Sequence, residues 1–125
     1  MRALKTIFLT GAGFAMLAMA GCHSHYVQTT IMNDGPTTLE NIEVDYPSAS
    51  FGLASLAPGA RFNYRFKIDG SGKMKLLTQS NLGQASSEVG PYVAEGQEGS
   101  LEIDMNRAGK NVWTVKLVPE VAAPK

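Results

Sequence analysis

The stretch that decides the fold is residues 61–68, which read RFNYRFKI. Its aromatic and aliphatic side chains alternate strictly with Arg, Asn, Arg and Lys. In a β-strand this alternation places all four apolar side chains on one face, whereas a helix would scatter them around its axis. We therefore expect a half-buried strand here, with one apolar face and one polar face.

A glycine-rich turn sequence, DGSG at residues 69–72, follows this strand, and the chain then reads KMKLLT over residues 73–78. The second stretch also alternates, with Met, Leu and Thr on one face. Two alternating stretches on either side of a short turn predict a β-hairpin. We expect residues 61–68 and 73–78 to be paired neighbours in one sheet.

The remainder of the chain after residue 25 also consists of short strand-like stretches between turn residues, without three turns of helical periodicity. Further strands are expected near residues 26–32, 39–46, 84–89, 101–105 and 112–117, whereas residues 51–56 are a short apolar stretch whose structure the pattern leaves ambiguous. About seven short strands with frequent turns are typical of an all-β, antiparallel β-sandwich. We expect this domain to span residues 26–117 and residues 118–125 to be a flexible tail.

The start of the chain has the pattern of an export signal. Arg2 and Lys5 precede an uncharged, mostly apolar stretch at residues 7–20, IFLTGAGFAMLAMA. As a helix with a rise of about 1.5 Å per residue, this stretch would reach roughly 21 Å, which is short of the ~30 Å hydrocarbon core of a bilayer. A short apolar segment behind a basic start is typical of a cleaved signal peptide and not of a spanning helix.

The end of this segment, Met19-Ala20-Gly21-Cys22, resembles the lipobox of bacterial lipoproteins. The resemblance implies that the chain is cleaved just before Cys22, whose thiol receives a diacylglycerol and whose amine is acylated. Two or three acyl chains anchor a protein stably, whereas one chain binds only marginally. The alternative is an ordinary signal peptide cut after Ala20, which would leave Cys22 as a free thiol.

The lipobox reading divides the start of the chain into a signal peptide at residues 1–21 and a lipidated tether at residues 22–25. His23 stands where an Asp retains many lipoproteins of this kind in the inner membrane. The resemblance therefore implies a lipid anchor in the bacterial cell envelope, in the outer membrane and facing the periplasm.

Charge and cysteine content argue against a nucleic-acid-binding protein and against a fold held by disulfides within the chain. Removal of Arg2 and Lys5 leaves nine basic side chains against eleven acidic ones, without any block of like charge. This balance gives no electrostatic case for binding nucleic acid. The single cysteine cannot form a disulfide within the chain.

The order of features after residue 25 resembles the small Ig-like or transthyretin-like β-domains of bacterial envelope proteins. The resemblance rests on NDG at residues 33–35, LENIEV at 39–44, LAPG at 56–59 and FNYRF at 62–66. It implies an Ig-like sandwich but no particular activity, because this fold carries many functions. The Cys…Trp…Cys core of antibody domains is absent from the sequence.

The sequence offers little catalytic chemistry. A nucleophilic triad needs a histidine that a scaffold holds in place, and the two histidines, His23 and His25, lie in the tether. On that tether they would bind Cu²⁺ or Zn²⁺ only loosely. Two carboxylate pairs, Glu43 with Asp45 and Glu102 with Asp104, are expected on solvent-facing sides of strands. We therefore expect no enzymatic activity, no cofactor and no structural metal.

Basic side chains supply the candidate interaction face. Arg61, Arg65 and Lys67 align on the polar face of their strand, and Lys73 and Lys75 would lie on the strand paired with it. Together they predict a cationic stripe that faces acidic glycan, lipid headgroups or a partner protein. The alternative is the ordinary solvated charge of an outer sheet face.

These observations favour a membrane-anchored, non-enzymatic structural or interaction module of the envelope, with a protein or glycan partner. A carbohydrate- or peptidoglycan-binding module is the alternative, and an inhibitor of a secreted hydrolase or toxin is a further one. An exposed aromatic cluster would favour a glycan, and Tyr92, in an expected connection at residues 90–99, is the aromatic expected to be exposed. A long unpaired edge strand would instead favour a protein partner.

Overall fold

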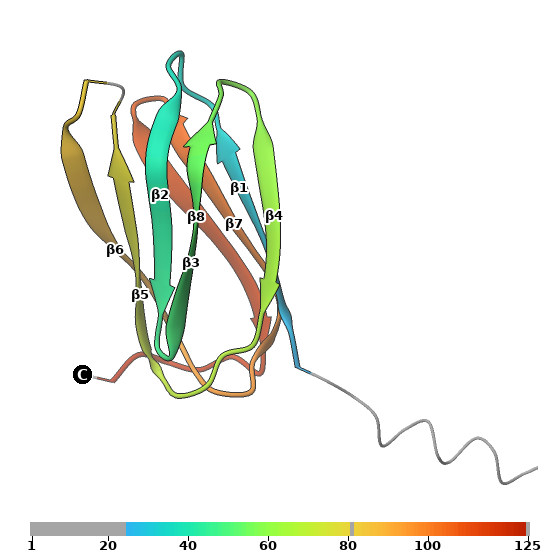
Figure 1. Cartoon of the computed structure of the whole chain (residues 1–125). Helices are drawn as coiled ribbons and strands as arrows, with labels where there is room; N and C mark the ends of the chain where they lie inside the picture. The colour runs from blue at the N-terminus through green and yellow to red at the C-terminus, as the bar shows by residue number, and fades with distance from the viewer. Residues whose placement is uncertain (1–24, 81, 125) are drawn as a thin grey trace, which may run out of the picture.

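The computed structural model describes residues 25–80 and 82–124, which form eight strands and the turns between them (Figure 1). The strands are β1 (Val27–Asn33), β2 (Leu39–Tyr46), β3 (Ala49–Leu56), β4 (Arg61–Phe66), β5 (Gly72–Gln79), β6 (Ala85–Val93), β7 (Glu98–Arg107) and β8 (Lys110–Val118). The predicted signal peptide and Cys22 lie outside the described residues.

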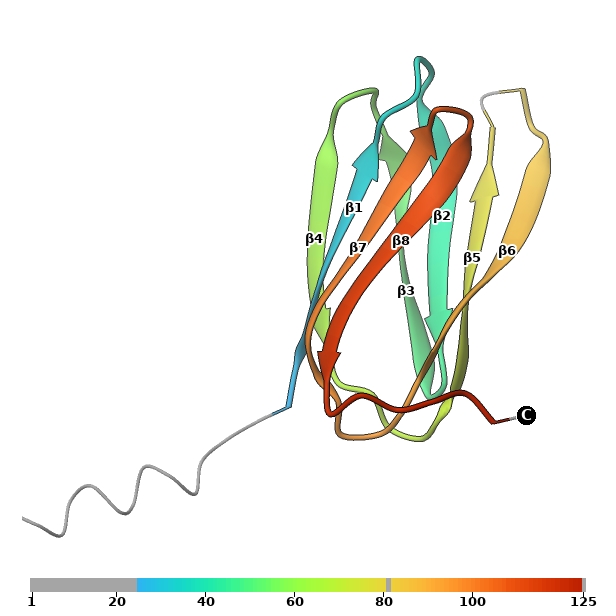
Figure 2. The ribbon, with the colours of Figure 1, turned by 180° about the vertical axis from the view of Figure 1, so that it is seen from behind.

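The strands form two four-stranded sheets that pack face to face, as Figures 1 and 2 show from opposite sides. One sheet has the order β4-β1-β7-β8, and the other has the order β3-β2-β5-β6. The all-β sandwich predicted from the alternating stretches is therefore confirmed. The eighth strand is β3, which sequence periodicity left ambiguous because its buried side chains, Phe51 and Leu56, do not alternate regularly.

The first strand occupies an interior position in its sheet. β1 pairs with β4 in antiparallel fashion, and on its other side it pairs with β7 in parallel, with Val27 opposite Gly99 and Ile31 opposite Ile103. The expectation of a wholly antiparallel sandwich is therefore wrong at this pair. Parallel neighbours need a long connection, and here all four strands of the other sheet and β4 lie between β1 and β7 in the chain.

The predicted hairpin between residues 61–68 and 73–78 is also wrong. β4 pairs with β1 in one sheet, whereas β5 pairs with β2 and β6 in the other. The segment between them crosses from one sheet to the other, a path of about 10 Å that five extended residues can span. Ile68 is buried within this crossing segment, which fixes the segment against the core.

The core lies between the two sheets and consists of the alternate side chains of the central strands. The predicted inward faces of β2, β5 and β7 are confirmed by burial. The largest fully buried apolar side chains are Ile31, Ile42, Met74, Leu76, Leu101, Ile103 and Met105. The edge strands differ, since Tyr64 of β4 and Val115 of β8 are exposed although the pattern placed them on apolar faces. An edge strand has less of the opposing sheet above it, so part of its inward face remains open to solvent.

Aromatic rings close the side of the sandwich where β3 and β4 meet. The rings of Phe51 and Tyr64 stack with their centroids 4.2 Å apart, and those of Tyr46 and Phe66 stack at 4.1 Å. On the opposite side, Trp113 of β8 packs against the core and against β6. Tyr46, Tyr64 and Trp113 therefore serve packing.

A buried amide holds together the end of the sandwich far from the N-terminus. Asn33 is fully buried, and its Nδ2 donates to the carbonyl oxygens of Thr37 at 2.8 Å and Leu56 at 2.9 Å. Its Oδ1 accepts from the backbone N–H of Gly35 at 2.9 Å. One side chain thus links the turn after β1 to the last residue of β3. A buried amide with all its bonds made specifies a unique arrangement of the chain around it.

The C-terminal segment continues past the expected end of the domain. β8 runs to Val118, and residues 119–124 extend beneath the sandwich without regular secondary structure (Figure 2). Gln97 Nε2 donates to the Pro119 carbonyl oxygen at 2.7 Å. This hydrogen bond attaches the beginning of the predicted tail to the domain.

Candidate interaction surfaces

The five basic residues predicted to form one stripe lie on two different sheets. Arg61 and Arg65 belong to β4, with Lys67 just after it, whereas Lys73 and Lys75 belong to β5. All five side chains are exposed. Because β4 and β5 are not paired, the stripe is split into two groups, and the prediction of one continuous cationic face is not met.

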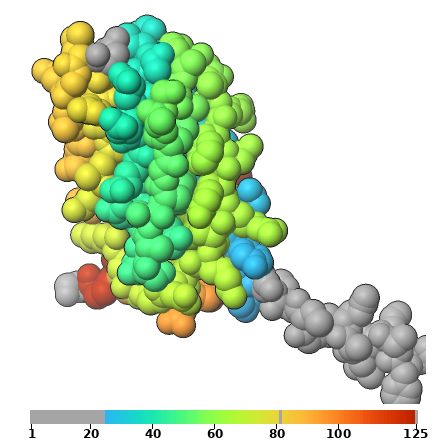
Figure 3. All heavy atoms as spheres, in the orientation of Figure 1, coloured from blue at the N-terminus to red at the C-terminus, as the bar shows by residue number. Residues whose placement is uncertain are grey.

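Two members of the first group, Arg65 and Lys67, gather around an aromatic ring where the chain enters the sandwich. The guanidinium carbon of Arg65 lies 4.3 Å from the centroid of the Tyr26 ring, and Lys67 Nζ lies 5.8 Å from it. Tyr26 is 38% exposed, so its ring is also open to solvent. We call these three residues the basic–aromatic corner. In Figure 3 the blue N-terminal residues border the green of β4 at this corner.

His25 belongs to the same end of the molecule. Its Nδ1 lies 2.6 Å from Glu98 Oε1 at the start of β7. The sequence placed His25 on a tether where no scaffold fixes it, and the structure instead holds it against the domain. Glu98 lies more than seventy residues away in the chain, so sequence spacing gives no sign of this contact.

A groove opens beside the second half of β8. It has a volume of about 470 Å³ and is lined by Tyr92, Gln97, Val115, Lys116, Leu117, Val118, Glu120 and Val121. Val115 is 41% exposed and Val118 is 58% exposed, so the groove contains branched aliphatic side chains that are open to solvent. The sequence analysis expected Tyr92 in a connection between strands, but Tyr92 lies within β6. We call this feature the β8 groove.

The groove begins where β8 separates from β6. In the first half of β8, Asn111 Nδ2 donates to Glu88 Oε1 at 2.8 Å, and Trp113 packs against Gly90. These contacts hold the two edge strands together. Among the described strands, β8 pairs with β7 alone, so its outer edge beyond Trp113 carries no neighbouring strand.

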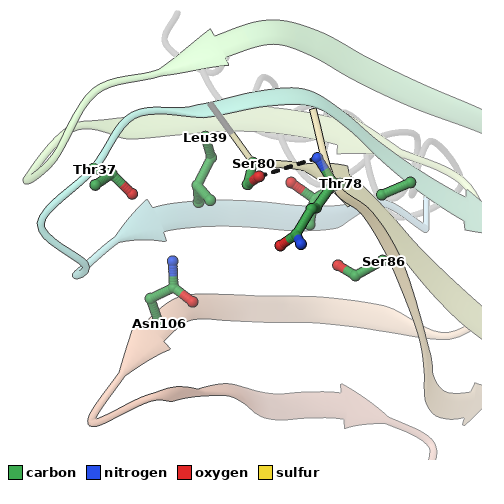
Figure 4. Close-up of a pocket in the computed structure, with 8 residues that line it drawn as sticks. Thr37, Leu39, Thr78, Ser80, Ser86 and Asn106 are labelled. Atoms are coloured by element: carbon green, nitrogen blue, oxygen red, sulfur yellow. Dashed lines mark hydrogen bonds between the residues drawn. The ribbon is translucent and has the colours of Figure 1, made fainter. Parts of the chain in front are cut away.

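A second pocket lies at the opposite end of the sandwich, away from the N-terminus (Figure 4). It has a volume of about 440 Å³ and is lined by Thr37, Leu39, Thr78, Ser80, Gln84, Ala85, Ser86 and Asn106, all of them uncharged. Figure 4 shows Asn106 across the open space from Thr78 and Ser86, which come from the other sheet. Thr78 Oγ1 has no hydrogen-bond partner among the described residues and is out of contact with solvent. We call this feature the distal pocket.

One predicted surface carboxylate is buried instead. Glu43 and Glu102 are exposed as expected, but Asp104 is only 6% exposed. A hydrogen bond to the carboxyl group of Asp34 is the main reason that the pKa of Asp104 is raised, and burial and the charge of Asp34 act in the same direction. Arg107 Nη1, 3.6 Å from Asp104 Oδ2, opposes this shift without cancelling it. Asp34 belongs to the turn after β1, far away in sequence, so a pattern within one strand could not reveal the pair.

Residues 25–80 and 82–124 contain neither a metal-holding cluster nor a membrane-spanning helix. No group of three or more His, Cys, Asp or Glu side chains there is arranged to hold a metal ion. The same residues contain no helix that is long and apolar enough to cross a membrane.

Comparison with known proteins supports the fold and goes no further. No family model matches the chain, and no curated protein is similar enough to match it. The NMR structure of a protein from Eubacterium rectale is similar, with a TM-score of 0.53 over 73% of this chain and 88% of that one. The two sequences are 10% identical, so the similarity shows a shared fold alone.

Proposed function

We propose that this chain is a lipid-anchored, non-enzymatic interaction module of a bacterial envelope, and that its partner is a protein. The anchor is Cys22, at the end of the lipobox-like sequence. The partner supplies an extended segment that lies along the outer edge of β8 and places apolar side chains in the β8 groove.

The observation that carries this proposal is the combination of an unpaired strand edge with an adjoining groove that contains exposed apolar side chains. β8 contains no proline between Lys110 and Val118, so each residue of this strand has a backbone N–H, and those that point outward beyond Trp113 are available to an added strand. A strand added from a partner would satisfy these groups, while pockets for alternate side chains supply specificity. The exposed Val115 and Val118 and the ring of Tyr92 offer apolar surface for those side chains.

The other edge strands fit this role less well. β6 carries Pro91, which cannot donate a hydrogen bond to an added strand. β3 and β4 lie on the side of the sandwich that stacked aromatic rings close, and β4 is also the shortest strand. The β8 edge is the one that adjoins a groove lined by exposed valines.

The test is a site-specific crosslinking experiment in native membranes. A photoreactive amino acid at position 115 is expected to capture one protein in near-equal amount, whereas the same amino acid at position 89 is not. Val89 is the matched control, because it is 62% exposed on β6 and does not line the groove. Val115→Glu is expected to abolish co-purification of that protein, and Val89→Glu is expected to preserve it. Equal capture from both positions, or co-purification that survives Val115→Glu, would refute the proposal.

A saccharide is the second candidate ligand, and the distal pocket is the observation that favours it. The pocket presents hydroxyl and amide groups and no charge, a combination that suits a neutral polyhydroxylated ligand. The buried Thr78 hydroxyl lacks a partner, and rotation of its side chain would let a ligand supply one.

Titration with maltotriose and with the trimer of N-acetylglucosamine, followed by amide NMR shifts, tests this second candidate. Saturable shifts near Thr78, Ser86 and Asn106 are expected, and Thr78→Val is expected to remove them. Because Thr78→Val also removes an unpartnered buried hydroxyl, it should leave the free energy of unfolding unchanged or slightly higher. The absence of saturation at about 10 mM of either sugar would count against a glycan ligand, since weaker binding carries little free energy.

A further inference from the structure

We propose that the basic–aromatic corner, Tyr26 with Arg65 and Lys67, binds the headgroups of anionic lipids and holds the domain against the bilayer by its β4 edge. This inference rests on the lipid anchor at Cys22 that the proposed function includes. It adds a second contact with the membrane and a defined orientation of the sandwich on it.

The length of the tether brings the corner close to the lipid surface. Four peptide units separate Cys22 from Tyr26, and an extended chain covers at most about 3.6 Å per residue. Tyr26 therefore lies within roughly 14 Å of the residue that carries the acyl chains. Attraction between surface charges acts over a Debye length of about 8–10 Å. A tether this short allows Arg65 and Lys67 to come within that distance of the lipid headgroups.

The chemistry of the corner suits a lipid interface. Tyrosine is amphipathic and is enriched at the level of lipid headgroups. Arg65 and Lys67 lie over its ring, so the cationic groups are gathered at one place and are not spread along the strand. Each basic side chain close to an anionic leaflet adds to membrane attraction, and a guanidinium group can bind a phosphate through two donors.

Acidic side chains at the same end of the sandwich restrict the orientation. Glu98 contacts His25 Nδ1, and Glu95 Oε1 accepts from the backbone N–H of Gly70, next to Asp69 in the loop after β4. An anionic surface repels these carboxylates, so an upright domain that rests on its loops is disfavoured. A domain tilted onto its β4 edge brings Arg65 and Lys67 to the surface and lifts the acidic loops away.

This tilt has a consequence for the proposed partner site. β4 and β8 are the two opposite edges of one sheet, in the order β4-β1-β7-β8. When the β4 edge rests on the bilayer, the β8 edge and its groove face away from the membrane. The corner would thus keep the β8 groove accessible to a protein.

The test uses the full lipidated protein in vesicles of phosphatidylcholine, with or without phosphatidylglycerol. A single new cysteine carries a spin label, at Gln28, which is paired with Arg65, or at Thr114 on β8. With phosphatidylglycerol present, the accessibility of the Gln28 label to an aqueous nickel chelate is expected to fall severalfold, while the Thr114 label remains accessible. Arg65→Gln with Lys67→Gln is expected to restore accessibility at Gln28.

Lys73→Gln with Lys75→Gln is the matched control, because it removes the same charge from the other sheet and is expected to leave the protection of Gln28 intact. Protection that is equal in both kinds of vesicle, or that survives Arg65→Gln with Lys67→Gln, would overturn the inference. Vesicle flotation checks the lipid anchor separately. Protein that does not float with the vesicles has no lipid anchor at Cys22, and the inference then fails together with that part of the proposed function. Crosslinking from position 115 is read independently, so the two proposals can fail separately.

Discussion

Gly90 of β6 lies directly against the indole ring of Trp113 of β8, so closely that a Cβ atom on Gly90 would lie 2.6 Å from Trp113 Cη2. This contact joins the edges of the two sheets just before the β8 groove opens. A glycine is needed there because any side chain would overlap the ring.

Gly90→Ala is expected to lower the free energy of unfolding by about 1–3 kcal/mol, the usual cost of forcing an extra methyl group into a packed site. Urea unfolding followed by circular dichroism measures the change. Gly72→Ala is the control, because its Cβ would meet Pro47 Cγ at an ordinary 3.7 Å. That variant is expected to be neutral or slightly stabilising. Equal losses in the two variants would contradict the steric explanation.

Asn33→Ala is expected to cost about 3 kcal/mol of stability, because it leaves three backbone groups without their hydrogen-bond partner. The measurement is again urea unfolding. Asn63→Ala is the comparison, since Asn63 makes one exposed bond, from Thr30 Oγ1 at 2.8 Å, and its loss should cost at most about 1 kcal/mol. A small effect at Asn33 would mean that water replaces the amide.

Asp104 is expected to make stability fall as pH rises. Its folded-state pKa is raised above the ordinary value of 3.8, chiefly by the hydrogen bond to Asp34, so the folded protein holds the proton of Asp104 more tightly than the unfolded chain does. This contribution is fully present below 3.8 and is lost as pH rises through the raised pKa. Asp104→Asn cannot lose a proton and should therefore gain stability relative to the wild type over this range.

Unfolding free energies of the wild type and of Asp104→Asn, measured from about pH 3 to about pH 6, test this sign. Glu43→Gln is the matched control, since Glu43 is an exposed carboxylate on β2. It should follow the wild-type pH profile. A stability difference between Asp104→Asn and the wild type that is constant with pH would contradict the raised pKa of Asp104.

The mature protein is expected to begin at Cys22 with two or three acyl chains, and mass spectrometry of the membrane fraction would measure their mass directly. Cys22→Ser is expected to leave an unprocessed or unanchored chain, because the acylated thiol is the substrate for cleavage in lipoproteins that this signal resembles. A mature N-terminus at Gly21 with an unmodified thiol would support an ordinary signal peptide.

The sequence predicts the layer architecture better than the pairing of strands. Alternation in β2, β5 and β7 reflects burial on one face, which is a local property, and those predictions are confirmed. The partner of a strand is a non-local property. The turn after β4 looks like a hairpin turn, yet β4 pairs with β1, and the chain crosses to the other sheet.

The same limit applies to the candidate surfaces. Arg65 and Lys67 were identified from the sequence, but their neighbour Tyr26 comes from the start of the chain and could be placed only by the β1–β4 pairing. Val115 alternates with Thr114 and Lys116 as a core side chain would, whereas the position of β8 at the sheet edge leaves it exposed. Burial depends on which residues of the opposing sheet cover a side chain, and the sequence of a single strand does not show this.

The interior position of β1 determines how late in synthesis the chain can complete its first sheet. β1 is synthesised first, yet one of its neighbours, β4, follows only after two strands of the other sheet, and β7 follows later still. Pairings between segments so distant in the chain form slowly, because the entropy of closing long loops is lost before contacts compensate for it. The sheet that contains β1 therefore stays incomplete until nearly the whole chain has been made. Until then one edge of β1 is an unpaired strand edge, to which another chain can add a strand.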